Sequence, residues 1–248
     1  IVMLLLAYIV VLKQRLRVFM SPPVLVVTLA LGAGGTLLLF RTASVTVIGF
    51  MERRRGIYLR NLNMFILRQM GSRINTSYVT MALVCLMLFI SLSAVFTGMG
   101  MSSAILQEAG EWAEDAAASA TMVSYLAVYL GVVFMIAAAA VLAIGQLSDA
   151  SDNAARYGLL RKLGAEERMI SRAFFTQTLI YFAAPTIPAL VHTAVAMRMF
   201  EGQLTILIGS GGGESGMLAA AAALAVYIGY FIAAYRGGRA IVLTAGRG

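Results

Sequence analysis

The chain has 248 residues, of which 60% are hydrophobic and only 12% are charged, and its formal net charge is +8. This composition excludes an ordinary soluble domain, in which about a quarter of the residues are charged. In a membrane protein, an excess of Lys and Arg marks the cytoplasmic loops, so the positive charge predicts how the chain is oriented in the membrane. We therefore expect no nucleic-acid partner. The one cysteine, Cys85, excludes an internal disulfide.

Long stretches without a charged residue alternate with charged segments along the whole chain. Each stretch meets or exceeds the roughly 20 apolar residues that are needed to cross a hydrocarbon core about 30 Å thick. We therefore predict an all-α fold, a polytopic bundle of transmembrane helices. The uncharged stretches cover residues 18–40, 74–107, 116–148, 173–197 and 215–235.

Residues 1–56 form a first region of apolar segments bounded by basic groups at residues 13–17 and 53–55. The charge rule places both basic groups in the cytoplasm, so the chain between them would cross the membrane an even number of times. A hairpin of two short transmembrane helices that turns near residues 40–44 would do this, with Arg41 reaching the outer interface. The alternative is one long span that violates the charge rule locally.

The segment from Tyr58 to Thr76 has apolar residues at helical spacing among several arginines. This pattern predicts an amphipathic helix in the inner membrane interface, with its arginines near anionic headgroups. The helix is either a surface anchor only or a lever that transmits movement to the next span. The residues that define it are Leu62, Phe65, Ile66, Arg68 and Arg73.

Four spans are predicted in the second region, residues 57–248. The first two are separated by an acidic segment, residues 108–115, which has no basic residue and should be external. The next loop, residues 147–172, has five Lys and Arg residues and should be cytoplasmic, and a glycine-rich turn at residues 209–213 should again be external. The spans are expected at about residues 77–98, 122–146, 174–197 and 216–235.

A short helix of about three turns is predicted in the loop that follows the second of these spans, at roughly residues 152–163. Polar residues at 148–152 can cap its beginning, and Gly164 suits the position after its end. Three leucines form an apolar stripe flanked by charges, which docking against a partner explains better than a solvated loop does. These leucines are Leu159, Leu160 and Leu163.

Two prolines and the only histidine lie in the span at about residues 174–197. Pro185 and Pro188 predict either a structural kink, which neighbouring helices can absorb, or a gating hinge. His192 is interpreted as a hydrogen-bonded packing residue, with a protonation switch as the alternative. The sequence has no Ser/His/Asp set, metal-spaced cluster or Walker-type phosphate loop, so we expect no enzymatic activity, metal or cofactor in this chain.

Two of these segments carry a resemblance to a known family. The sequence Leu-Arg-Lys-Leu-Gly-Ala, within residues 159–165, resembles the cytoplasmic signature of FtsX-like permeases of ABC transporters. Residues 148–157, and residues 65–76 just before a span, are similar to the bacitracin-resistance branch, whose permeases transport or dislodge antimicrobial peptides. The chain would correspond to the C-terminal half of such a permease. It begins inside an apolar segment without an initiator Met, so we expect it to be a fragment.

The resemblance implies a multi-pass permease subunit in a bacterial inner or plasma membrane. A separate cytosolic ATPase, as a dimer of subunits, would bind ATP and Mg²⁺ and contact residues 148–170. The other expected partners are the remaining half of the permease, the lipid membrane and a sensor histidine kinase. The residues carried over to the ATPase-coupling interface are Asp152, Arg156, Tyr157, Leu160, Arg161, Leu163 and Gly164.

One departure from the family concerns the first two of the four spans. The family has a large extracellular domain between them, whereas this chain has only about twenty residues between 99 and 121. Either the native protein has a domain there that this sequence omits, or peptides would bind laterally between membrane helices. The alternative functions are a mechanotransmitting permease for lipoprotein extraction or cell-wall signalling, and a secondary transporter. A secondary transporter is disfavoured because no uncharged stretch has an embedded Asp, Glu or Lys.

Overall fold

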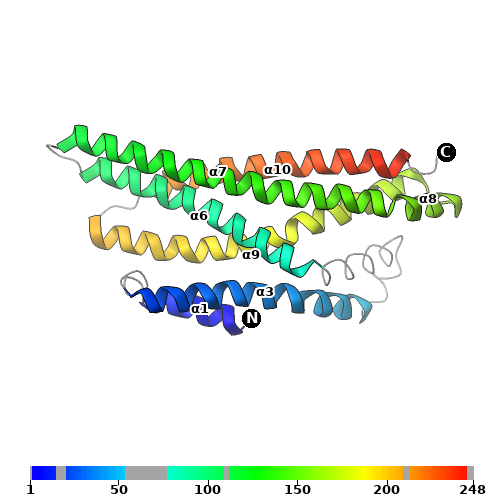
Figure 1. The fold of residues 1–248 in the computed structure, drawn as a ribbon, viewed down its shortest axis with the longest axis horizontal. Coiled ribbons are helices and arrows are strands. Elements are labelled where there is room, and N and C mark those ends of the chain that lie inside the picture. The colour runs from blue at the N-terminus through cyan, green and yellow to red at the C-terminus, as the bar shows by residue number, and fades with distance from the viewer. Residues whose placement is uncertain (1, 15–20, 54–76, 109–111, 209–212, 245–248) are drawn as a thin grey trace. The chain divides into compact units, whose positions relative to one another are not determined.

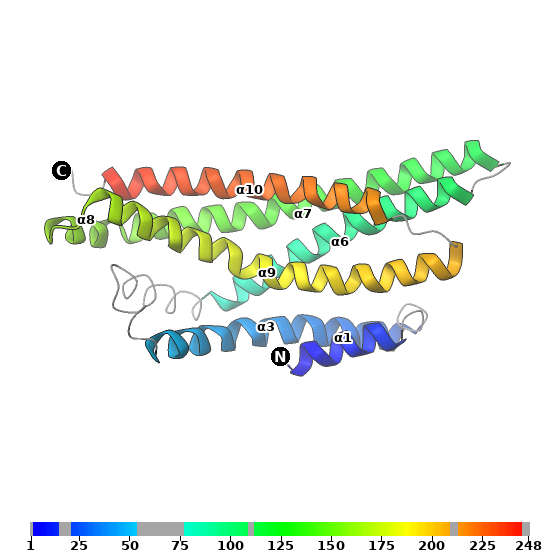
Figure 2. The same cartoon turned by 180° about the vertical axis from the view of Figure 1, so that it is seen from behind.

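The computed structural model describes residues 2–14, 21–53, 77–108, 112–208 and 213–244 (Figures 1 and 2). Almost all of this part of the chain is α-helical, which confirms the predicted all-α fold. The described helices are α1 (Val2–Gln14), α3 (Pro22–Arg53), α6 (Tyr78–Glu108), α7 (Ala113–Asp152), α8 (Ala154–Lys162), α9 (Glu167–Ile208) and α10 (Gly213–Thr244).

Four of the helices are long and apolar enough to cross a membrane, counted over the described residues: Pro22–Ala43, Tyr78–Leu106, Ala113–Asp152 and Glu167–Phe200. Many of their large apolar side chains point outward; Met122, for example, is 75% exposed and Ile144 is 71% exposed. Exposed apolar surface along whole helices is unfavourable in water but matches a hydrocarbon surrounding. The helices therefore indicate a multi-pass membrane protein.

The predicted spans at about residues 77–98, 122–146 and 174–197 lie inside α6, α7 and α9, and the one at about 216–235 lies inside the 32-residue α10. Residues 109–112 are all that separates α6 from α7. The sequence therefore has a short connection where the family resemblance leads us to expect an extracellular domain.

The predicted hairpin in the first region is wrong, because α3 is one continuous helix through residues 40–44. This stretch has no glycine or proline to turn the chain, and the Thr42 hydroxyl donates to the Leu38 carbonyl at 2.8 Å as part of a regular helical turn. The alternative of one long span matches the structure. A single crossing by α3 would put the basic groups at residues 13–17 and 53–55 on opposite sides of the membrane, against the charge rule.

The chain divides into two compact units that share its long helices. Unit 1 comprises residues 1–36, 85–138 and 187–227, and unit 2 comprises residues 37–84, 139–186 and 228–248. Within α9, the division falls between Pro185 and Pro188.

Small residues allow close helix packing in unit 1. A Cβ atom added to Gly98 of α6 would lie 1.9 Å from the Cβ of Ala127 of α7, and one added to Gly131 would lie 2.2 Å from Cγ2 of Val95. The Ser91 hydroxyl donates to the Gly131 carbonyl at 2.7 Å. Close approach through small residues is a common basis of helix association in membranes, where dispersion contacts replace the hydrophobic effect. It fixes α6 against α7 in this unit.

Candidate docking site at the short helix α8

The helix α8 begins after a one-residue break, Asn153, that separates it from α7. Asn153 is the N-cap residue, but its side chain makes no capping hydrogen bond; its amide instead donates to the Asp149 carbonyl at 2.9 Å and to Asp149 Oδ1 at 3.1 Å. The expected capping by the polar residues at 148–152 is therefore wrong. Those residues still belong to α7, which runs on to Asp152.

The end of α8 follows the prediction for Gly164. The Gly164 amide donates to the Arg161 carbonyl and the Ala165 amide donates to the Leu160 carbonyl, both at 3.0 Å. This pair of bonds is the Schellman motif, and Gly164 has the left-handed φ of +94° that the motif requires. The motif turns the chain sharply from α8 into α9.

The inward side of α8 is part of an apolar core in unit 2. Tyr157 is only 2% exposed, and its ring meets that of Phe174 of α9 edge to face, with the centroids 6.4 Å apart. Leu160 and Ala165 pack against the same core. Burial of these side chains stabilises the position of α8 against α9 and α10. The core residues are Ala150, Tyr157, Ile170, Phe174 and Val242.

A buried chain of hydrogen bonds links α8 to both neighbouring spans. The Tyr157 hydroxyl donates to Gln177 Oε1 at 2.7 Å, and Gln177 Nε2 donates to Asp149 Oδ2 at 2.9 Å. Burial raises the pKa of the Tyr157 hydroxyl to about 12, so it remains a protonated donor at neutral pH. One turn along α7, Gln146 donates to the buried Thr178 hydroxyl of α9 at 3.0 Å. Since buried polar groups are costly when unpaired, these bonds hold the three helices in one arrangement.

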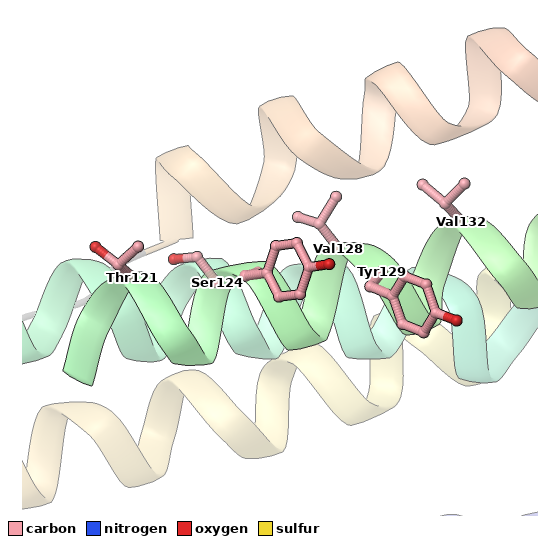
Figure 3. Close-up of a pocket in the computed structure, with 6 residues that line it drawn as sticks. Thr121, Ser124, Val128, Tyr129 and Val132 are labelled. Carbon is pink, nitrogen blue, oxygen red and sulfur yellow. The ribbon is translucent and has the colours of Figure 1, made fainter. Parts of the chain in front are cut away.

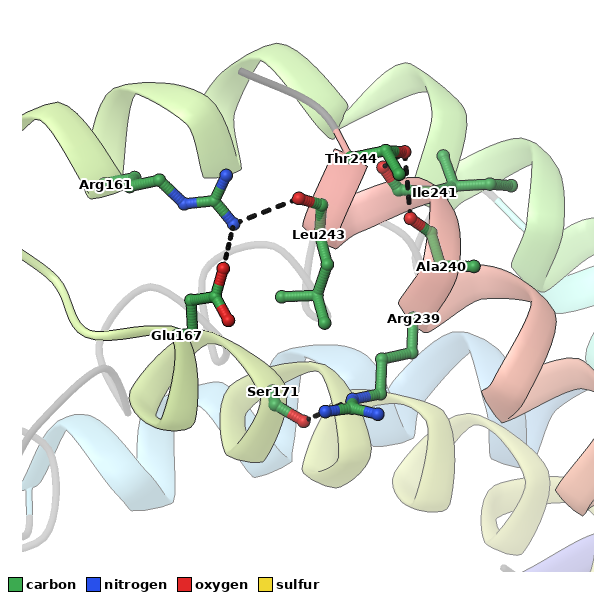
Figure 4. A network of polar contacts seen from close by, with 8 residues as sticks. All are labelled: Arg161, Glu167, Ser171, Arg239, Ala240, Ile241, Leu243 and Thr244. Atoms are coloured by element: carbon green, nitrogen blue, oxygen red, sulfur yellow. Dashed lines mark hydrogen bonds and ion pairs between the residues drawn. The ribbon is translucent and has the colours of Figure 1, made fainter. Parts of the chain in front are cut away.

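Arg161 connects the outer edge of α8 to the ends of α9 and α10 (Figure 4). Its Nη2 donates to the Leu243 carbonyl at 3.2 Å and lies 3.6 Å from Glu167 Oε1. The Leu243 carbonyl is in the last turn of α10, where carbonyl groups have no partner within the helix and favour a cation. Arg161 thus contributes to the internal structure of unit 2.

The outward side of α8 carries apolar side chains beside charged ones. Leu163 is 84% exposed and Leu159 is 60% exposed, and Arg156 and Lys162 are also exposed. Asp152 and Gly164 lie exposed at the two ends of the helix. We call Arg156, Leu159, Lys162 and Leu163 the α8 outer face.

The structure thus divides the seven predicted interface residues into two groups. Asp152, Arg156, Leu163 and Gly164 are exposed, whereas Tyr157, Leu160 and Arg161 pack or bond within unit 2. Asp149 and Gln177, which hold Tyr157, were absent from the predicted set. The sequence indicated Asp149 only as one of the polar residues that could cap α8, and no local sequence pattern indicates Gln177.

Other predicted residues lie elsewhere. The amphipathic segment with Leu62, Phe65, Ile66, Arg68 and Arg73 is outside the described residues. Pro185 and Pro188 stand inside the continuous helix α9, so the kink and the hinge both stay predictions.

His192 lies in a buried polar cluster of unit 1. It bonds to the Tyr8 hydroxyl through Nδ1 and to the Thr36 hydroxyl through Nε2, the latter at 3.0 Å. Since Thr36 donates its own proton to the Gly32 carbonyl at 2.7 Å, Nε2 carries the imidazole proton and Nδ1 accepts from Tyr8. These bonds tie α9 to α1 and α3, as the packing interpretation of His192 requires.

A shallow groove of about 500 Å³ runs along the exposed side of α7 (Figure 3). The rings of Tyr125 and Tyr129 stack there with their centroids 6.3 Å apart. The described lining has hydroxyl and apolar groups but no charged side chain. The residues are Thr121, Ser124, Tyr125, Val128, Tyr129 and Val132.

Within the described ranges, no three His, Cys, Asp or Glu side chains come together as metal ligands. A scan against protein-family models and searches of curated proteins and of solved structures find no match for this chain. Among the described residues, the α8 outer face stands out because exposed leucines lie there beside basic side chains on a helix whose other side is buried.

Proposed function

We propose that the chain is the membrane-spanning permease subunit of an ATP-driven ABC transporter and that the α8 outer face docks a separate cytosolic ATPase. The single observation that carries the proposal is a short helix that is fixed firmly to two membrane spans on its inward side while Leu159 and Leu163 are exposed on the other. A solvated loop would need neither the buried hydrogen bonds nor the exposed leucines.

The apolar and cationic composition of this face supports a protein partner. Exposed leucines release ordered water when they enter a pocket, and charged residues around them set orientation and specificity. Arg156 and Lys162 favour an acidic rim on the partner, which is a general form of electrostatic complementarity. The ATPase would bring ATP and Mg²⁺, and this chain would have no enzymatic activity of its own.

The hydrogen-bonded core behind the face supports a role in transmitting force. A displacement of α8 would be passed to α7 through Asp149 and to α9 through Gln177 rather than being absorbed in a flexible loop. The likeness of residues 148–157 and 65–76 to the bacitracin-resistance branch supports antimicrobial peptides as the substrates that are exported or dislodged. It also supports a bacterial inner or plasma membrane as the location.

Photo-crosslinking in native membranes tests the docking. A photoreactive amino acid at position 163 should give an adduct with a protein that contains nucleotide-binding motifs, identified by mass spectrometry. The matched control is the same photoreactive residue at position 244, which is exposed at the end of α10 but lies off α8. An ATPase adduct that is equally abundant from both positions, or adducts only with proteins that bind no nucleotide, would refute the proposed docking.

A charge reversal of the apolar face provides a second measurement. Leu163→Asp should lower recovery of the ATPase with the permease at least tenfold, because a buried unpaired carboxylate costs several kcal/mol. Thr244→Asp adds the same charge off α8 and should leave recovery unchanged.

A further inference from the structure

The beginning of α9 and the end of α10 together present cationic, hydroxyl and aromatic side chains in one continuous strip. We call this strip the cationic–aromatic stripe; its residues are Arg168, Ser171, Arg172, Phe175, Tyr235 and Arg239. The α9 members are spaced three and four residues apart, which places them on one face of that helix. All six belong to unit 2.

Hydrogen bonds and ring contacts hold the two helices together along this stripe. Arg239 Nε donates to the Ser171 hydroxyl at 2.9 Å (Figure 4), and the Ser171 and Tyr235 hydroxyls lie 3.3 Å apart. The Phe175 ring stands edge-on to Tyr235, with the centroids 5.3 Å apart. The guanidinium of Arg239 is thus held by the Ser171 hydroxyl, which lies in turn beside the Tyr235 hydroxyl.

The positive charge of the stripe is not neutralised within the described part of the chain. Arg168, Arg172 and Arg239 are exposed, and no described carboxylate forms an ion pair with them. Three guanidinium groups in one strip create a positive potential that favours an anion. Guanidinium groups also bind phosphate oxygens in a bidentate manner, which Lys cannot match.

The stripe and the aromatic rings that continue from it along α9 together cover about the depth of one membrane leaflet. Ten residues separate Arg172 from Phe182, a rise of about 15 Å, or half of a hydrocarbon core about 30 Å thick. Over this length the rings continue through Phe231, which lies 6.0 Å from Phe175 and 5.5 Å from Phe182 between centroids. The charged residues lie at one end of this length. Of the three rings, Phe175 is exposed, Phe231 is half-buried and Phe182 is buried, so Phe175 and Phe231 form the ring surface that an acyl chain could reach. Tyr235 has an apolar ring and a polar hydroxyl, a combination that is typical of the boundary between lipid headgroups and acyl chains.

We propose that the cationic–aromatic stripe is a specific binding site for an anionic phospholipid. The phosphodiester accepts hydrogen bonds from Arg239 and Arg168 and from the Ser171 hydroxyl, and an acyl chain lies along the exposed side of Phe175. A lipid rather than a free phosphate is the occupant, because the charged end continues directly into an aromatic surface, on which Phe175 is 40% exposed. The proposal does not depend on an ATPase partner.

Native mass spectrometry of the purified full chain, exchanged into either phosphatidylglycerol or phosphatidylcholine, tests the site. We expect retained phosphatidylglycerol to exceed retained phosphatidylcholine, and each of Arg168→Gln and Arg239→Gln to lower its affinity about fivefold, the factor expected for one cation near an anionic lipid. Lys162→Gln removes one positive charge from α8 instead and should leave the affinity unchanged.

Arg239→Gln also removes the hydrogen bond that joins α10 to Ser171 of α9, so a loss of lipid with this variant could have a structural cause. Arg172→Gln avoids this, because Arg172 is exposed and makes no described contact with α10. It should also weaken retention of phosphatidylglycerol. Equal retention of the two lipids, or an equal loss with Lys162→Gln, would overturn the proposal, since either result would reduce the stripe to nonspecific charge. A loss of phosphatidylglycerol with each of the three arginine variants, and no loss with Lys162→Gln, would support it.

Discussion

Replacing Tyr157 with Phe should weaken the attachment of α8 to α9 without disturbing its apolar packing. The change deletes only the hydroxyl that donates to Gln177 Oε1 at 2.7 Å and keeps the ring that meets Phe174. Gln177 is buried, so its oxygen is left without that donor in a place that water does not readily reach. Loss of one partner of a buried hydrogen bond costs about 1–3 kcal/mol.

Thermal unfolding of the purified chain in lipid nanodiscs measures this cost. Since 1 kcal/mol corresponds to a shift of about 2–4 °C in a chain of 150–250 residues, the midpoint of Tyr157→Phe should fall by several degrees. Tyr129→Phe removes a hydroxyl from an exposed ring of α7 and should leave the midpoint unchanged.

A double-mutant cycle isolates the hydrogen bond from other effects. Tyr157→Phe combined with Gln177→Leu should cost less than the sum of the single changes, with a coupling free energy of about 1 kcal/mol. Strict additivity, or a Tyr157→Phe midpoint equal to that of the native chain, would refute the argument that this bond fixes α8 to the membrane spans.

Three further predictions concern pH, the end of α8 and orientation. Burial raises the pKa of Tyr157 from about 10 to about 12, so the hydroxyl contributes fully to stability below pH 10 and this contribution is lost as the pH rises towards 12. The free energies of unfolding of the native chain and of Tyr157→Phe should therefore converge between pH 9 and 12. A constant difference between them over this range would contradict the prediction. Gly164→Ala should destabilise the chain by about 1–2 kcal/mol, because φ is +94° although the added Cβ meets nothing. Gly229→Ala, in open space inside α10, should stabilise the chain by up to about 1 kcal/mol in the same denaturation assay. A stabilising Gly164→Ala or a destabilising Gly229→Ala would be inconsistent with this account. A cysteine at Glu114 should react with an impermeant thiol reagent in intact cells and one at Gly164 should not, since acidic residues precede α7 and basic residues surround α8; labelling at Gly164 would reverse the orientation.

Local sequence determined the features that depend on neighbouring residues alone. Uncharged stretches predicted α6, α7 and α9, because the ability to cross a membrane depends on the length and composition of one segment. Gly164 identified the end of α8 for a similar reason, since a left-handed backbone conformation favours glycine at a helix end whatever lies around it.

The same local reasoning failed where several structures satisfy one pattern. The charge rule favoured a hairpin in residues 18–51, but the backbone runs as one helix from Pro22 to Arg53, because no proline after the first turn interrupts the hydrogen bonds between successive turns. The polar residues before α8 looked like caps, yet α7 extends through them for the same reason. Capping side chains permit a helix to begin without requiring it to begin there.

Only the tertiary structure decided which side of α8 is available to a partner. Leu159, Leu160 and Leu163 form one apolar group in the sequence, but Leu160 packs on the core of unit 2 while the other two are exposed. Asp149 and Gln177, which hold Tyr157, are 28 residues apart and belong to different helices. A helical pattern states which residues share a face. Which neighbour covers that face depends on how α7, α9 and α10 pack, and that packing results from many weak contacts between residues distant in sequence.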